Sequence, residues 1–239
     1  TYTTEEELQV PNGNMEEWHL ETIKSQHLYR AWAQGEASPW WANNNLRSTW
    51  YTVWAVEHNS APAVSYLLER GGIVAEIRST GSGSGYANTA TICYEGSRIP
   101  GMLFIGDYSY DKPNETINYG REFASRPMAL KFWYHYTPYN NEEFEAYIEV
   151  QHRTDKDTIV LASGVFTSAI ATSDYQQANI ILEYKNQELK ATHMYIRFLS
   201  STAAKPAVKK QQINLEGVKN GWGAHVGSRL KIDDIELVY

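Results

Sequence analysis

Alternation of apolar and polar residues in the second half of the chain constrains the fold more than any other feature. In the stretch MALKFWYHY, residues 128–136, one face of an extended chain carries Met128, Leu130, Phe132, Tyr134 and Tyr136. The segment FEAYIEVQ, residues 144–151, has the same period of two. Because successive side chains of a strand point to opposite faces, this period predicts strands that are buried on one side.

Short apolar runs separated by Gly, Asn, Asp and Ser clusters predict further strands. They lie at 64–69, 72–79, 89–95, 101–108, 158–163, 178–184, 193–201 and 228–239. We see no long amphipathic helix and no internal repeat. The sequence therefore predicts one all-β domain over residues 1–239, a sandwich of two antiparallel sheets, with residues 1–10 as a tether or N-terminal extension.

Charge and cysteine content exclude several classes of protein. The formal net charge is -7 and no run of five Lys or Arg occurs, so nucleic acid is not an expected partner. Cys93 is the single cysteine, which rules out an internal disulfide and predicts a buried, inert thiol. No stretch approaches the ~20 apolar residues of a spanning helix, and no signal sequence opens the chain, so export would imply a targeting segment already removed.

The aromatic residues point to a recognition surface. The chain has 8 Trp and 17 Tyr but only 6 Phe. Trp and Tyr combine an apolar ring with a hydrogen-bonding group, which suits a flat surface that is exposed to solvent. The stretch PWWANNN sets Trp40 and Trp41 beside Asn43 and Asn44. A sugar presents C–H patches to a ring face and hydroxyls to amides, so these four residues are our first candidates for a sugar site. Neighbouring residues point in opposite directions, which predicts that one ring packs and the other is exposed.

Further candidates for sugar contact lie in loops and near turns. They are Tyr108 and Tyr110 in GDYSYDKP, Arg126 before a proline, and Trp222 in the glycine-flanked NGWGAH. Flanking glycines leave the Trp222 ring few neighbouring side chains to pack on, which favours exposure at a loop tip. For all these aromatics the competing interpretation is that they belong to the core.

An ordered set of motifs resembles a known family. NGNMEEW, PWWANNN, GMLFIGDY, YGREFASRPMALKFWYHYTP, FLSS and GSRLKIDDIELVY follow one another as in the putative carbohydrate metabolism domain, a family of bacterial surface lipoproteins from glycan-foraging gut anaerobes. The resemblance runs over nearly the whole chain and is strongest at 119–139 and 221–239. It implies a β-jelly-roll similar to carbohydrate-binding modules, export to the surface or periplasm of a Gram-negative bacterium, and a lipid anchor outside this chain. It implies no catalytic residue.

The closing LKIDDIELVY is also similar to the last strand of many jelly-roll carbohydrate-binding modules. In those modules an acidic residue of that strand and a Glu near the first strand often hold a structural calcium, which here implies Asp233 or Asp234 with Glu16 or Glu17. Both Asp side chains could bind one ion only if the backbone kinks between them. The alternative is that one Asp faces solvent while the other bonds backbone groups at a bulge.

Catalysis has one weak candidate. Glycoside hydrolysis needs two carboxylates about 5 Å apart in retaining enzymes, or about 6.5–9.5 Å apart in inverting ones. Glu145 and Glu149 share a strand face but lie ~13 Å apart at ~3.3 Å per residue. Glu145 would be a general acid only if its face is concave, and a solvated carboxylate is the alternative.

Three functional hypotheses therefore remain. The first is a non-catalytic glycan-binding domain of an exported lipoprotein, whose partner is an oligosaccharide or polysaccharide. The second is a glycoside hydrolase or lyase with an acidic pair not yet located. The third is a structural or adhesion module whose aromatics are core. A binding domain should have exposed aromatic rings. A hydrolase should have two carboxylates that point into a cleft, and an adhesion module should have a large exposed apolar patch.

Overall fold

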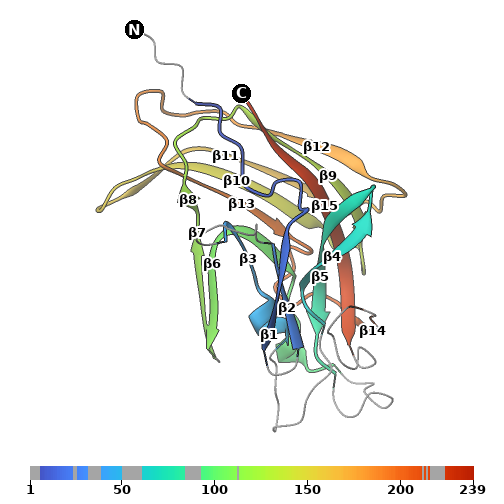
Figure 1. Ribbon diagram of the computed structural model, residues 1–239. Helices are drawn as coiled ribbons and strands as arrows, with labels where there is room; N and C mark the ends of the chain where they lie inside the picture. Colours follow the sequence, from blue (N-terminus) through green and yellow to red (C-terminus); the bar gives the residue numbers. More distant parts are fainter. Residues whose placement is uncertain are drawn as a thin grey trace.

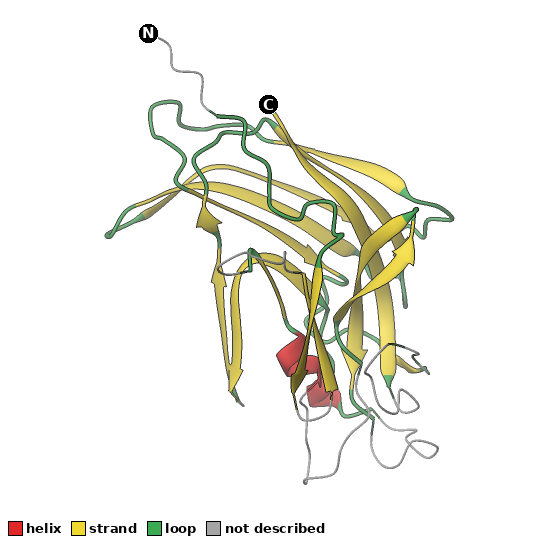
Figure 2. Ribbon diagram, viewed as in Figure 1, coloured by secondary structure: helices red, strands yellow, loops and turns green. Residues whose placement is uncertain are grey.

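The computed structural model describes residues 6–23, 26–31, 39–49, 61–83, 93–111, 113–211, 213, 215 and 224–239. Within these residues nearly all regular structure is antiparallel β-sheet, as Figure 2 shows. The exceptions are the short helix α1 (Asn45–Thr49) and a 3₁₀ turn, η1 (Glu95–Ser97). The predicted all-β fold is confirmed.

Two sheets form the β-jelly-roll sandwich (Figure 1). The seven-stranded sheet has the order β11 (Thr158–Ser168), β10 (Phe144–Arg153), β13 (His193–Leu199), β6 (Met102–Asp111) and β3 (Trp41–Asn43), with β7 (Asn114–Tyr119) paired to β6 and β8 (Arg121–Glu122) paired to β13. The six-stranded sheet has the order β12 (Gln176–Ile181), β9 (Ala129–Thr137), β15 (His225–Val238), β5 (Gly72–Gly81) and β4 (Val64–Glu69), with β14 (Lys209–Lys210) paired to β15. A separate hairpin joins β1 (Trp18–Ile23) and β2 (Gln26–Ala31).

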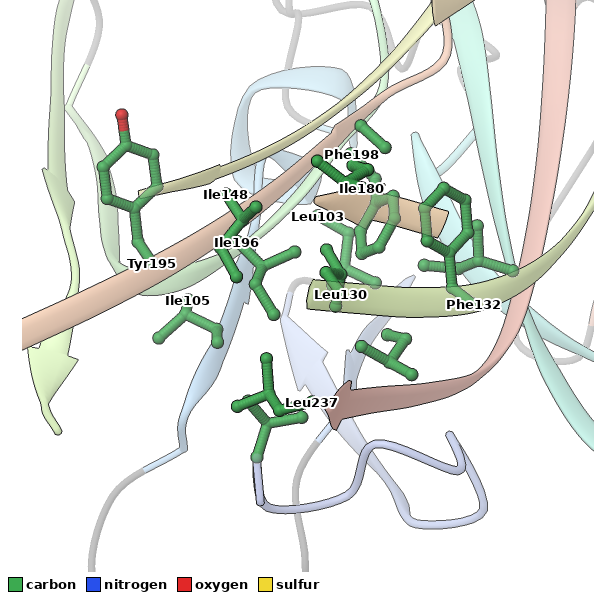
Figure 3. Close-up of a cluster of buried hydrophobic side chains, with 14 of the residues drawn as sticks. Leu103, Ile105, Leu130, Phe132, Ile148, Ile180, Tyr195, Ile196, Phe198 and Leu237 are labelled. Atoms are coloured by element: carbon green, nitrogen blue, oxygen red, sulfur yellow. The ribbon is translucent and has the colours of Figure 1, made fainter. Parts of the chain in front are cut away.

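The core lies between the two sheets and follows the alternation of the sequence (Figure 3). Leu130 and Phe132 of β9 meet Ile148 of β10 and Ile196 and Phe198 of β13, and all five are fully buried. Phe132 and Phe198 pack edge to face with ring centres 5.1 Å apart. The intervening residues of the same strands therefore form two outer faces, one on each sheet, and those faces carry the polar chemistry of the protein.

Two sequence predictions need correction at the ends of strands. Met128 was placed on the buried face of its strand, but it is 57% exposed because β9 begins one residue later, at Ala129. The strand expected over 89–95 is described only from Cys93, which forms an isolated bridge with Gly83, and the chain turns into η1 at Glu95. Cys93 is a free, partly buried cysteine, and burial raises the pKa of its thiol.

The described part of the N-terminal segment lies against β15. Val10 is buried, and Leu8 packs against the core. The amide of Gln9 donates to the Leu237 carbonyl at 2.6 Å and accepts from the Leu237 N–H at 2.8 Å. Residues 8–10 of the predicted tether or extension are thus attached to the edge of the sandwich.

Candidate functional site

The two tryptophans of PWWANNN both contribute to the core, to different extents. Trp41 begins β3 and is buried, its indole N–H donates to the Pro11 carbonyl at 2.9 Å, and its ring lies 6.4 Å from that of Phe198. Trp40 is half-buried and packs against the same core. The Trp41 ring is therefore inaccessible to a ligand, and only part of the Trp40 ring is accessible.

The three asparagines that follow bind the protein's own backbone. Asn43 donates to the Tyr29 carbonyl at 2.8 Å. Asn44 donates to the Pro100 carbonyl at 2.8 Å and accepts from the Met102 N–H at 3.0 Å. Asn45, which sequence reasoning left out, is the most buried of the three.

Asn45 joins two distant segments. Its side-chain amide donates to the carbonyls of Tyr29 and Val64 at 3.0 and 2.8 Å and accepts from the Val64 N–H at 2.8 Å, while its own N–H donates to Asn43. Buried backbone groups must be paired, and this amide supplies partners to backbone groups of Tyr29 and Val64. The asparagines are thus structural side chains in this fold.

The remaining predicted sugar contacts are spread over the molecule. Tyr108 and Tyr110 lie half-buried on β6, and the Tyr108 hydroxyl donates to Glu115 at 2.7 Å. Arg126 donates to the carbonyls of Asn186, Gln187 and Leu189 and lies over the Tyr184 ring at 4.3 Å, so it fixes a loop. Trp222 lies outside the described residues. Of the described residues, Tyr108 and Tyr110 thus share one strand, while Arg126 binds a different part of the chain.

The four acidic residues considered for calcium do not form a metal shell. β15 is kinked between Asp233 and Glu236, with Asp234 at a φ of +46°, so Asp233 and Asp234 both reach one cation. That cation is Arg70, at 2.5 and 3.1 Å. Asp233 is buried and also accepts from the Asp234 N–H, whereas Asp234 is exposed, as the bulge alternative predicts.

Glu16, of the acidic pair near the first strand, has a different partner from Asp233 and Asp234. Glu16 accepts from the Ile73 N–H at 3.0 Å, while Glu17 is exposed. Among the residues that the structure describes, no group of three or more His, Cys, Asp and Glu could hold a metal ion. The motifs do meet, since the Ile235 N–H donates to the Gly13 carbonyl at 2.7 Å, but their carboxylates do not fit a calcium shell.

Glu145 lies on the outer face of the seven-stranded sheet, among tyrosines. It pairs with Arg197, whose guanidinium lies 5.5 Å from the ring centre of Tyr147. Tyr195 points away from Ile196 and the core in Figure 3 and stacks on Tyr119 with ring centres 4.8 Å apart. The ring faces and carboxylates of this surface are largely occupied by one another, and Glu149, on the same strand face as Glu145, accepts from the Tyr147 hydroxyl at 2.5 Å.

A cavity of about 520 Å³ lies on the outer face of the six-stranded sheet. Its walls come from β4, β5, β9, β14 and β15 and from single residues beyond β14, with Leu67, Glu69, Glu76, Arg78, Thr137, Pro138, Tyr139, Lys209, Gln211, Ile213, Leu215, Gly227, Arg229 and Lys231 lining it. Cross-strand pairing places Lys231 next to Glu76, and Arg229 next to both Arg78 and Thr137. The cavity is therefore polar, and Tyr139 contributes the one aromatic ring among its described lining residues.

A buried ion pair forms the deepest charged group of the cavity. Arg78, 1% exposed, pairs with Glu76 and donates to the Pro62 carbonyl and the Ser65 hydroxyl at 2.7 and 2.5 Å. Burial alone would raise the pKa of Glu76, but Arg78, followed by Arg229 and Lys231, holds that pKa below its ordinary value of 4.5. Glu76 is thus ionised at neutral pH and is no proton donor.

The second carboxylate of the cavity is also held. Glu69 accepts from the Lys231 ammonium at 2.6 Å and from the Tyr175 hydroxyl at 2.8 Å. Tyr175 extends the polar face away from the cavity, since it lies near the His135 ring and under the Arg70 guanidinium. Both acidic residues therefore serve to fix cations, and the cavity offers hydrogen-bond donors to a ligand.

Sequence reasoning missed this cavity. The only signal was the alternation in SRLKIDD, which puts Arg229, Lys231 and Asp233 on one strand face. Nothing in the sequence indicates that Arg78 and Glu76 of β5 lie beside them, because that depends on which strands pair.

The fold and site define a β-sandwich protein with a cationic, hydrogen-bonding cavity on one outer face. The model of the putative carbohydrate metabolism domain family matches residues 14–238. The chain therefore belongs to this family, which confirms the resemblance noted in its sequence and supports a carbohydrate-related role.

Two solved structures from Bacteroides species share the fold. A putative glycoside hydrolase from Bacteroides vulgatus ATCC 8482 is 18% identical with a TM-score of 0.65, over 94% of this chain and 96% of that one. A putative glycoside hydrolase from Bacteroides thetaiotaomicron VPI-5482 is 14% identical with a TM-score of 0.58, over 95% of this chain and 70% of that one. At these identities the similarity shows the fold. No curated protein matches the chain significantly, and no helix in its described part is long and apolar enough to cross a membrane.

Proposed function

We propose that the protein binds an oligosaccharide in the cavity of the six-stranded sheet without cleaving it. The observation that carries this proposal is the cavity itself. Its volume of about 520 Å³ lies in the range of small-ligand sites, and it combines one aromatic ring with several hydrogen-bonding side chains. The Tyr139 ring can pack against a sugar face while Gln211, Arg229 and Thr137 meet hydroxyls.

The state of the carboxylates favours binding over hydrolysis. A glycosidase needs a protonated acid beside an ionised carboxylate. In the cavity Glu76 is ion-paired with a lowered pKa, and Glu69 is held by a lysine and a tyrosine. The two neighbours described as putative glycoside hydrolases make cleavage the second candidate, and the experiment below separates the two.

We also propose the setting implied by the family resemblance. The domain belongs to an exported lipoprotein of a Gram-negative bacterium and acts at the cell surface or in the periplasm, where polymeric glycans are met. Fractionation of the source cells with a labelled full-length protein tests this part, and a cytoplasmic signal would contradict it.

Binding and cleavage are tested by filling the cavity. Thr137 is exposed on the cavity wall, so Thr137→Trp places an indole where the sugar is proposed to lie. Thr167→Trp, at an exposed position of β11 on the other sheet, is the matched control. A glycan array and calorimetry should show binding that is lost in the first variant and kept in the second, with no release of reducing ends.

Each other result changes the conclusion. Release of reducing ends by the wild type would make the protein a hydrolase. Binding that survives Thr137→Trp would place the sugar elsewhere. Silence across a broad array would favour a structural or adhesion module.

A further inference from the structure

The cavity carries more positive than negative charge, although the whole chain is acidic. Among the residues that the structure describes, its charged lining consists of the cations Arg78, Lys209, Arg229 and Lys231 and the anions Glu69 and Glu76. The chain as a whole has a formal net charge of -7. A positive site in a negative protein selects for anions and raises their local concentration.

The two carboxylates neutralise only two of these cations. Glu76 forms its buried pair with Arg78, and Glu69 contacts Lys231 at 2.6 Å. Both of these contacts have hydrogen-bond geometry, and in both the charges cancel locally. Arg229 forms only a longer ion pair with Glu76, at 3.9 Å, and no described carboxylate of the cavity is within hydrogen-bond distance of Arg229 or Lys209.

Arg229 and Lys209 are left facing the cavity. The Arg229 guanidinium lies 3.9 Å from Glu76, beyond hydrogen-bond distance, and its side chain is 30% exposed. Lys209 is exposed on β14, with its ammonium 5.2 Å from the ring centre of Tyr139. Among the residues described around the cavity, neither has a carboxylate within hydrogen-bond distance.

We infer that the cavity takes an anionic sugar, one that carries a carboxylate or a sulfate. This inference rests on the proposed function and narrows its ligand class. The planar fork of Arg229 suits two oxygens of one anionic group, and Lys209 adds a second charge beside the Tyr139 ring. A neutral sugar would leave both cations without a hydrogen-bonded anionic partner among the described residues.

Matched pairs of ligands test the charge directly. The probes are oligogalacturonates, alginate oligosaccharides and heparin-derived oligosaccharides, each with its carboxyl-methylated or desulfated counterpart, together with neutral cello- and xylo-oligosaccharides. We expect an acidic member to bind at least about tenfold tighter than its neutral counterpart, since one charge-assisted hydrogen bond has that effect. Binding should weaken as NaCl rises from low to high concentration.

Variants of the two cations assign the effect to the cavity. Arg229→Gln and Lys209→Gln should each weaken binding of the acidic ligand, Arg229→Gln by about tenfold, and Arg229→Lys should restore part of it. Lys209 is exposed, so its variant tests the inference even if the Arg229 variants fold poorly. Arg197→Gln, on the outer face of the other sheet, is the control that should leave affinity unchanged.

The outcomes separate this inference from the proposed function. Equal binding of acidic and neutral members, insensitive to salt, would overturn the inference and leave oligosaccharide binding intact. An array with no bound member would overturn both. Binding of carboxylated members only, or of sulfated members only, supports the inference and identifies the anionic group.

Discussion

The segment at residues 40–45 and the cavity of the six-stranded sheet both combine aromatic rings with hydrogen-bonding side chains, and they use them in different ways. In the segment, the Trp41 ring and the amides of Asn44 and Asn45 are buried and satisfied by the protein itself. In the cavity, Arg229 and Lys209 keep polar groups toward an open space. The residue types that suit a sugar-binding site, aromatic rings beside amides, can thus equally hold two loops against a sheet.

What distinguishes the two regions is where the polar groups find partners. Asn45 bonds backbone groups of Tyr29 and Val64, which lie far from it in the sequence. In the cavity, Glu76 and Glu69 hold two cations in place, and the other two are left for a ligand. Changes in the 40–45 segment should therefore alter stability alone, while changes at the cavity mouth should alter affinity.

The largest expected effect is on stability, at the floor of the cavity. Arg78→Met leaves Glu76 charged and buried without its hydrogen-bonded partner, with only Arg229 at 3.9 Å, which should lower the free energy of unfolding by about 3–5 kcal/mol in urea denaturation. The double variant Arg78→Met/Glu76→Leu removes both charges and should recover much of the loss. A loss below about 1 kcal/mol in the single variant would show that the pair is solvated.

Asn45→Ala should have the next largest effect. It leaves the Val64 carbonyl and the Val64 N–H without their side-chain partner and removes one of the two amide donors to the Tyr29 carbonyl, at a cost of about 1–3 kcal/mol in unfolding free energy. Calorimetric affinity for the bound oligosaccharide should be unchanged. Asn179→Ala, at an exposed position of β12, is the matched control and should alter neither quantity. A weaker affinity in Asn45→Ala would return the 40–45 segment to the binding site.

The strands could be predicted from the sequence because a period of two is a local property. β9 and β10 follow from residues a few positions apart, and the error at Met128 is one residue at a strand end. The kink that lets both Asp233 and Asp234 face one cation was also foreseeable as a condition on the backbone. That the cation is Arg70 was not, because Arg70 lies far away in the sequence.

The candidate site could not be predicted because it depends on strand order. The cavity requires β5 on one side of β15 and β9 on the other. This strand order places Glu76 next to Lys231 and Arg229 next to Thr137. Strand order follows from long-range packing that no single segment encodes. In contrast, PWWANNN attracted attention because its residue types suit sugars, yet residue type says nothing about whether a polar group is already bonded.

The pH dependence of stability should report on Glu76. Its pKa is lower in the folded protein than in the unfolded chain, so the folded state releases this proton more readily. The stabilisation is fully present above the ordinary value of 4.5 and is lost as pH falls through the folded pKa. The difference in unfolding free energy between wild type and Glu76→Gln should therefore shrink as pH is lowered below about 4.5. A difference that stays constant from pH 7 to pH 3 would contradict this assignment.

The smallest effect is expected on the outer face of the seven-stranded sheet. Glu145 and Arg197 form a partly exposed ion pair, and such pairs contribute about 1 kcal/mol or less. Glu145→Gln should therefore change unfolding free energy by no more than this amount and leave oligosaccharide affinity unchanged. If cleavage of any glycan is observed, the variant should cleave at the wild-type rate, because Glu145 is paired with a cation. A rate that falls by a hundredfold or more, the scale of a lost general acid, would move the active face from the six-stranded to the seven-stranded sheet.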